Sequence, residues 1–136
     1  MKSEHQLHAA KTSLAMAYRH LEAGFSPSTV LFAWQGAREA VRGVYTARTG
    51  RIPSDGLSIL EMIRQSGCQE FPIPVELILL LEDLGPRCAY PDSLIALIEE
   101  IPLDRAERVV KACDTIVAWA TEDSRRDENE DDTTLT

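Results

Sequence analysis

Residues 26–50 read SPSTVLFAWQGAREAVRGVYTARTG, and this stretch decides the fold class. Its apolar residues recur every three or four positions, which is the spacing of an amphipathic helix. They are Val30, Trp34, Ala37, Val41 and Val44. Pro27 suits the first turn of a helix, and Gly50 suits its end because glycine adopts the left-handed capping conformation at little cost. We therefore predict a helix over residues 26–49.

The opposite side of this helix is polar and carries charges of both signs. Arg38 and Arg42 lie one turn apart and repel each other unless an anion or a carboxylate lies between them. Glu39 is spaced to pair with Arg42. Gly36 and Gly43 lower the helix propensity and leave room for another helix to approach. This stripe either faces solvent or lines a groove or a dimer contact. Its members are Gln35, Arg38, Glu39, Arg42 and Thr46.

Outside this stretch the same helical spacing recurs, and no alternation typical of a strand has a useful length. Residues 75–84 (VELILLLEDL) are nearly all apolar, so we expect a helix there that is the most buried element. We expect a turn over residues 85–92. Further helices are predicted over residues 4–23, 54–65, 94–101 and 104–121, with caps at Ser54 or Asp55 and at Asp92 or Ser93. This order predicts an all-α, up-down bundle of about five helices.

Charge divides the chain into two parts. The 136 residues carry a net charge of −8, and 44% of them are hydrophobic, which suffices for a core. Residues 122–132 (EDSRRDENEDD) account for −5 of that charge, leaving −3 for the rest. We predict a folded domain over residues 1–121 and an acidic, disordered tail over residues 122–136. No basic face is evident, which argues against a general nucleic-acid binder but leaves a local basic patch open.

The sequence shows neither the pattern of a metal site nor that of a membrane segment. Cys68, Cys88 and Cys113 lack metal-binding spacing, so we expect reduced thiols and a cytoplasmic protein. His5 and His8 are three apart and could face the same way, but zinc normally takes three or four ligands. Apolar runs are far shorter than the roughly 20 residues that span a bilayer. We expect no metal, no cofactor and no membrane segment.

Two motifs and the last predicted helix resemble the HEPN domain family. In that family the second helix typically carries Gln-x-Ala-x-Glu-x-x-x-(Lys/Arg). The matching residues are Gln35, Ala37, Glu39 and, slightly shifted, Arg42. The family often has Arg-Tyr-Pro-Asp in the turn after the fourth helix, and this chain has Tyr90, Pro91 and Asp92 there. The closing amphipathic helix also fits, so the resemblance spans about residues 5–121.

The resemblance implies a bundle of about five helices that is often a homodimer. HEPN domains are commonly encoded beside, or fused to, a minimal nucleotidyltransferase. Many are ribonuclease toxins that use an Arg followed, after four to six residues, by a His. Others lack that pair and serve as binding or assembly modules.

This chain departs from the ribonuclease pattern. Its histidines, His5, His8 and His20, all fall in the first predicted helix, and Ala89 stands where the family often has arginine. Arg87 lies two residues earlier. In-line RNA cleavage usually needs a general base and a cation for the phosphate. We therefore assign no catalytic residue.

The resulting expectation is a non-catalytic, homodimeric interaction module that binds a partner protein such as a minimal nucleotidyltransferase. One alternative is a ribonuclease toxin with a divergent site around Arg87, Arg38 and Glu39. Another is a nucleotide- or anion-binding module that uses Arg38 and Arg42. Tyr90 and Asp92 also have simple structural interpretations, ring packing and helix capping. The candidate binding residues are Gln35, Arg38, Glu39, Arg42, Arg87, Tyr90 and Asp92.

Overall fold

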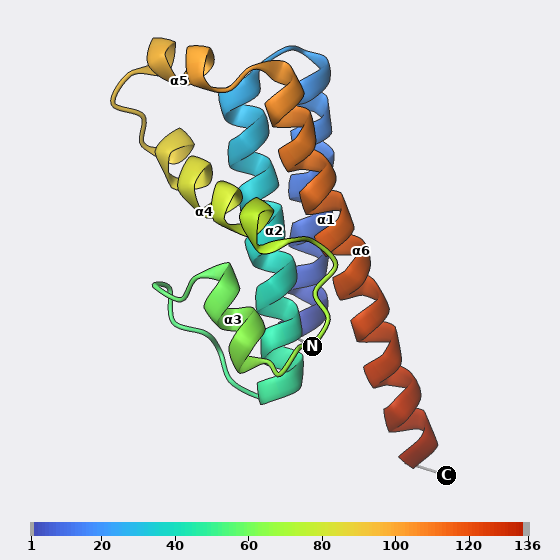
Figure 1. Cartoon of the computed structure of the whole chain (residues 1–136). Coiled ribbons are helices and arrows are strands. Elements are labelled where there is room, and N and C mark those ends of the chain that lie inside the picture. The colour runs from blue at the N-terminus through green and yellow to red at the C-terminus, as the bar shows by residue number, and fades with distance from the viewer. Residues whose placement is uncertain (1, 135–136) are drawn as a thin grey trace.

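Three long helices form the body of the protein (Figure 1). A computed structural model describes the backbone of residues 2–134 and the side chains of residues 4–126. Helix α1 (Lys2–Glu22) and helix α2 (Ser26–Thr49) are antiparallel, and α6 (Leu103–Thr134) runs alongside in the direction of α2. Gly24, at φ 82°, makes the tight turn between α1 and α2. The described chain is all-helical, as predicted.

Helix α2 lies at the centre of the fold and contacts every other described helix. Small residues allow this close packing. A Cβ atom at Gly36 would lie 3.1 Å from Cys113 Sγ on α6 and 3.2 Å from the Ala10 carbonyl oxygen on α1. The prediction that Gly36 lets another helix approach is therefore confirmed. Cys113 is fully buried there and behaves as a small apolar residue.

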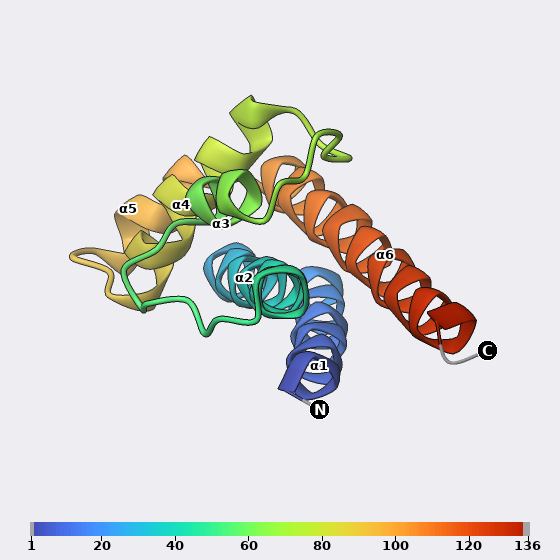
Figure 2. The same ribbon diagram turned by 90° about the horizontal axis from the view of Figure 1, so that it is seen from below.

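Three shorter helices cover one side of α2, opposite α1 (Figure 2). They are α3 (Ile59–Gln65), α4 (Val75–Ala89) and α5 (Leu94–Glu100). Trp34 of α2 lies directly against Gly85 of α4, where a Cβ atom would come within 2.1 Å of the indole. Only glycine fits at this crossing in the present geometry. Gly85 therefore brings the second layer of helices onto α2.

The predicted boundaries of α3 and α4 are wrong. Helix α3 begins five residues later than predicted, because Ser58 caps it by accepting a hydrogen bond from the Glu61 amide at 3.1 Å. Helix α4 continues through Gly85 and Pro86, where a turn was predicted. Its final turn closes when the Tyr90 amide donates to the Pro86 carbonyl at 3.2 Å.

Helix α4 is also not the most buried element. Val75 and Leu79 of α4 are about half exposed, at 50% and 55%. Buried residues are more frequent along α2, which has neighbours on several sides. Apolar composition alone did not reveal that α4 is covered on one side only.

Residues 122–134 differ from the predicted disordered tail, because α6 continues through Thr134. Asp123 is buried and accepts hydrogen bonds from the Arg48 guanidinium at 2.5 and 3.3 Å. Arg48 thus fixes the start of residues 122–134 to α2. The Glu and Arg residues within this segment also favour a helix. The last two residues of the predicted tail, 135–136, lie outside the described part of the chain.

Within residues 2–134, no helix combines the length and apolar content needed to cross a membrane. Across the described side chains, no three His, Cys, Asp or Glu residues are grouped closely enough to hold a metal ion. All three cysteines are free thiols.

Candidate functional site

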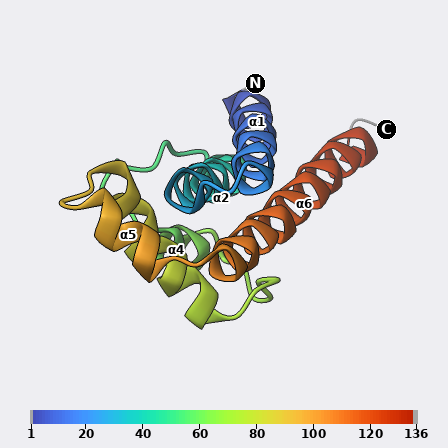
Figure 3. The same ribbon diagram turned by 90° about the horizontal axis from the view of Figure 1, so that it is seen from above.

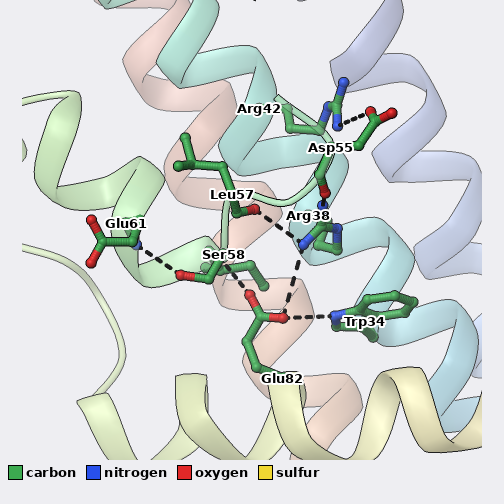
Figure 4. A network of polar contacts seen from close by, with 9 residues as sticks. Trp34, Arg38, Arg42, Asp55, Leu57, Ser58, Glu61 and Glu82 are labelled. Carbon is green, nitrogen blue, oxygen red and sulfur yellow. Dashed lines mark hydrogen bonds and ion pairs between the residues drawn. The ribbon is translucent and has the colours of Figure 1, made fainter. Parts of the chain in front are cut away.

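The Glu82 carboxylate is the centre of a polar network that joins α2, α3 and α4 (Figure 4). Its two oxygens accept hydrogen bonds from the Ile59 amide at 2.5 Å and from Trp34 Nε1 at 3.2 Å. Arg38 forms an ion pair with it at 3.9 Å. Glu82 thereby satisfies a free amide at the start of α3 and the indole that lies against Gly85. The position of Glu82 makes it a structural link between the helices.

The Arg38 guanidinium is surrounded by partners from the loop that leads into α3. It donates to the Leu57 carbonyl at 3.4 Å and to the Asp55 carbonyl at 3.3 Å (Figure 4). The central carbon of the guanidinium, Cζ, also lies 5.4 Å from the centre of the Trp34 ring, within the range of a cation–π contact. Arg38 therefore supports the loop and the α2–α4 crossing.

Arg42, one turn further along α2, is held much less firmly. Its side chain is only 19% exposed, yet its ion pair with the fully exposed Asp55 carboxylate is long, at 3.8 Å. Its Nε atom is buried without a hydrogen-bond partner. The Glu39–Arg42 ion pair considered from the sequence is absent among the described side chains. Arg42 is thus a nearly buried cation with spare hydrogen-bonding capacity.

Arg87 lies in a separate group at the far end of α4. It donates to Asp83 at 3.3 Å and pairs through both terminal nitrogens with Glu100 of α5, one contact being 2.9 Å. These hydrogen bonds lower the pKa of the Glu100 carboxyl below its ordinary value. Arg87 therefore joins α4 to α5.

Tyr90 and Asp92 line a shallow groove beside Arg87, with a volume of about 150 Å³. Tyr90 is 87% exposed, so the expectation that its ring packs is wrong. Ser93 caps α5 by accepting a hydrogen bond from the Ala96 amide at 3.2 Å, as one of the two predicted caps. Asp92 is exposed beside it. The Tyr90-Pro91-Asp92 motif thus lies at the surface.

The seven predicted residues do not form one site. Arg38 and Arg42 belong to the loop before α3, whereas Arg87 belongs to the groove with Tyr90 and Asp92. Glu82 and Arg87 are five residues apart on α4, so their side chains project about 140° apart around the helix. Gln35 is exposed, and Glu39 is half-buried and forms no ion pair among the described side chains. The divergent ribonuclease site around Arg87, Arg38 and Glu39 is not brought together here.

The histidines also lie apart from these arginines. His5 and His8 are exposed on α1. His20 shares a 2.7 Å hydrogen bond with Ser28 and packs against Phe32, with 4.9 Å between ring centres. These contacts place His20 in the α1–α2 corner. Among the described side chains, the partners of Arg38, Arg42 and Arg87 include no histidine.

Sequence reasoning missed the role of Glu82. In the sequence it is one of the few charged residues of the stretch 75–84, and no role was assigned to it. The sequence did contain a hint of this role. Glu82 directly follows five apolar residues, 77–81, and a charged residue next to such a run lies close to the core. Its partners Trp34 and Ile59 are 48 and 23 residues away. Such distant pairings cannot be read from local spacing.

Comparisons with known proteins support the fold and leave the site open. No protein-family model matches this chain, and no curated protein matches it. Among solved structures, the crystal structure of TT1696 from Thermus thermophilus is similar, with a TM-score of 0.69 and 22% sequence identity. The match covers 90% of this chain and 99% of that chain. At this identity the likeness shows a shared all-α bundle and nothing of activity.

Proposed function

We propose that this protein is a non-catalytic, HEPN-like interaction module that acts as a homodimer in the cytoplasm. Its partner would be a protein such as a minimal nucleotidyltransferase, which the family resemblance implies. The proposal rests on the structural contacts that the candidate arginines make. Arg38 supports a loop and Arg87 joins two helices, so neither is presented to a substrate. The three free thiols agree with a reducing compartment.

Light scattering on the full-length chain, with and without a co-expressed nucleotidyltransferase, tests this proposal. We expect a dimer whose mass is constant over about a hundred-fold range of concentration, and a stable complex with the nucleotidyltransferase. A chain that stays monomeric and forms no such complex would contradict it. Glu100→Gln breaks only an exposed ion pair, so this variant should dimerise normally and serves as a folding control.

Arg42 supports a second candidate, the binding of a small anion or a nucleotide phosphate. A nearly buried guanidinium with an unpartnered Nε–H and one long ion pair can donate a further hydrogen bond to a phosphate oxygen. Arg38 on the same face would add positive charge, although two of its N–H groups already donate to the loop before α3. The site would lie beside the exposed Asp55, which must move away from the anion.

Thermal unfolding in phosphate and in common nucleotides tests this candidate. A ligand present at about 100 times its Kd stabilises the protein by about 2.7 kcal/mol, a shift of several degrees. The shift should vanish in Arg42→Ala and persist in Arg64→Ala, which removes an exposed arginine elsewhere. If no nucleotide or phosphate changes the unfolding temperature of the wild-type chain, the candidate is excluded.

A further inference from the structure

Helix α5 exposes most of its apolar side chains. Leu94, Ile95 and Ile98 are 56%, 73% and 52% exposed, whereas Leu97 is 5% exposed. Leu103, which begins α6 just beyond, is also about half exposed. We call Leu94, Ile95, Ile98 and Leu103 the α5 surface. A seven-residue helix with three exposed large aliphatic side chains is unusual on a protein that acts alone.

The geometry of α5 shows why the bundle leaves this surface uncovered. Leu97 is the buried side chain of α5, which packs on α2 and is joined to α4 through Glu100 and Arg87. At about 100° per residue, Leu94, Ile98 and Ile95 follow on from Leu97 over an arc of about 160°. The apolar face of α5 is therefore wider than the part that the rest of the bundle covers. Helix α5 also projects from one end of the molecule, beside the start of α6 (Figures 1 and 3).

Acidic side chains border the α5 surface. Over residues 91–107 the only basic residue is Arg105, and there are several acidic residues. These are Asp92, Glu99, Glu100, Asp104 and Glu107. Glu100 pairs with Arg87 and Glu107 with Lys111. Among the described side chains, Asp92, Glu99 and Asp104 are exposed and form no ion pair.

We propose that the α5 surface binds a basic amphipathic helix of a partner protein. This inference rests on the proposed interaction function and specifies its surface and the chemistry of its partner. An apolar strip of aliphatic residues accepts the apolar face of a helix, and the acidic border pairs with lysine or arginine on either side of it. A second copy of this chain fits poorly, because a two-fold contact would place the acidic border against itself. An anionic membrane surface is repelled in the same way.

Two designed peptides of about 18 residues, or five helical turns, test the proposal against the full-length protein. Both carry leucine at the same helical spacing, one with lysine and the other with glutamate at the polar positions. Binding is measured by fluorescence anisotropy at low and high salt. We expect the lysine peptide to bind at least about ten-fold more tightly than the glutamate peptide, and more weakly at about 0.5 M salt than at about 0.05 M.

Matched variants locate the binding surface. Ile95→Ser with Ile98→Ser should weaken binding of the lysine peptide by about ten-fold or more. Val75→Ser with Leu79→Ser removes a comparably exposed apolar pair from α4 and should leave binding unchanged. Glu99→Lys should weaken binding of the lysine peptide and strengthen binding of the glutamate peptide. Circular dichroism should show the same helix content in every variant, because each replaced side chain is exposed.

Equal affinity of the wild-type chain and the Ile95→Ser, Ile98→Ser variant would overturn the inference. Absence of any preference for the lysine peptide would overturn it as well. Light scattering on the same samples separates this failure from failure of the proposed function. A dimer that forms the nucleotidyltransferase complex without using α5 refutes only the α5 surface, whereas a monomer without that complex refutes the module itself.

Discussion

The two layers of helices share one hydrophobic core but differ in their closest and their polar contacts. Helices α1, α2 and α6 meet through small apolar residues, and their contact at Gly36 is so close that a Cβ atom there would force its neighbours to move by a few tenths of an ångström. Helices α3 and α4 pack into the same core with fully buried aliphatic residues such as Ile59 and Leu81. They add one tight crossing at Trp34 and Gly85 and a polar contact at Glu82. The second layer carries the candidate site and the exposed apolar surface.

Ile116→Ala should have the largest effect, because it removes a fully buried side chain from α6 in the first layer. We expect the free energy of unfolding to fall by about 2–5 kcal/mol. Denaturant unfolding followed by circular dichroism measures it. Ile98→Ala, on the exposed face of α5, is the matched control and should change it by less than about 1 kcal/mol. Similar losses at both positions would contradict the burial of Ile116 in the core.

Gly85→Ala tests the crossing that joins the layers. A Cβ atom 2.1 Å from the Trp34 indole requires the two helices to separate, which should lower the free energy of unfolding by about 1–3 kcal/mol. The gain in helix propensity offsets up to about 1 kcal/mol of this loss. Gly56→Ala, where the new atom meets open space, is the control. A stability equal to that of the wild type would mean that Trp34 can turn aside freely.

High pH should weaken the first layer through Cys113. Burial raises the pKa of this thiol from 9.0 to about 12. Since the folded-state pKa is raised, the unfolded chain loses its proton first. The stabilisation is complete below pH 9 and declines as the pH rises towards about 12, by about 1.4 kcal/mol per pH unit.

Unfolding measured between about pH 8 and pH 11 on the wild type and on Cys113→Ala checks this expectation. The variant should show a shallower decline, with a remainder from Cys88, whose pKa burial raises to about 11. Identical pH dependence in both proteins would refute the assignment to Cys113.

Glu82→Gln should have the smallest effect on the free energy of unfolding. Its effect on hydrogen exchange should be confined to one part of the molecule. The amide oxygen can still accept from Trp34 or Ile59, but the charge opposite Arg38 is lost, so we expect a loss of about 1–2 kcal/mol. Hydrogen exchange should accelerate at the start of α3 and stay unchanged in α1. Asp83→Asn, at the exposed neighbouring position, should change neither quantity appreciably. Faster exchange throughout α1 would show that Glu82 supports the whole fold.

The sequence predicted α1, α2 and α5 better than α3, α4 and the end of α6. For α1 and α2, apolar spacing located both helices within two residues, because their buried residues recur at helical spacing. Helix α3 was misplaced because Ser58 caps its first turn, and not Ser54 or Asp55. Helix α4 was ended too early because Gly85 and Pro86 usually mark a turn, whereas here Gly85 accommodates Trp34.

The candidate site was predicted in its parts but not in its arrangement. The spacing of Arg38 and Arg42 correctly placed both on one side of α2, next to the same loop. Arg87 was grouped with them because a turn after residue 84 would have left its direction open. Since α4 continues to Ala89, the helix instead directs Arg87 towards Glu100. The unpredicted continuation of α4 therefore separates Arg87 from Arg38 and Arg42.

Incubation of the purified full-length protein with total RNA tests the central claim, that the arginines of this chain serve structure and not RNA cleavage. The protein is supplied in large excess, and the RNA is followed by gel electrophoresis beside a sample containing Arg87→Ala. This variant loses only exposed ion pairs and should remain folded. We predict intact RNA in both samples. Cleavage by the wild type that is absent with Arg87→Ala would contradict the claim.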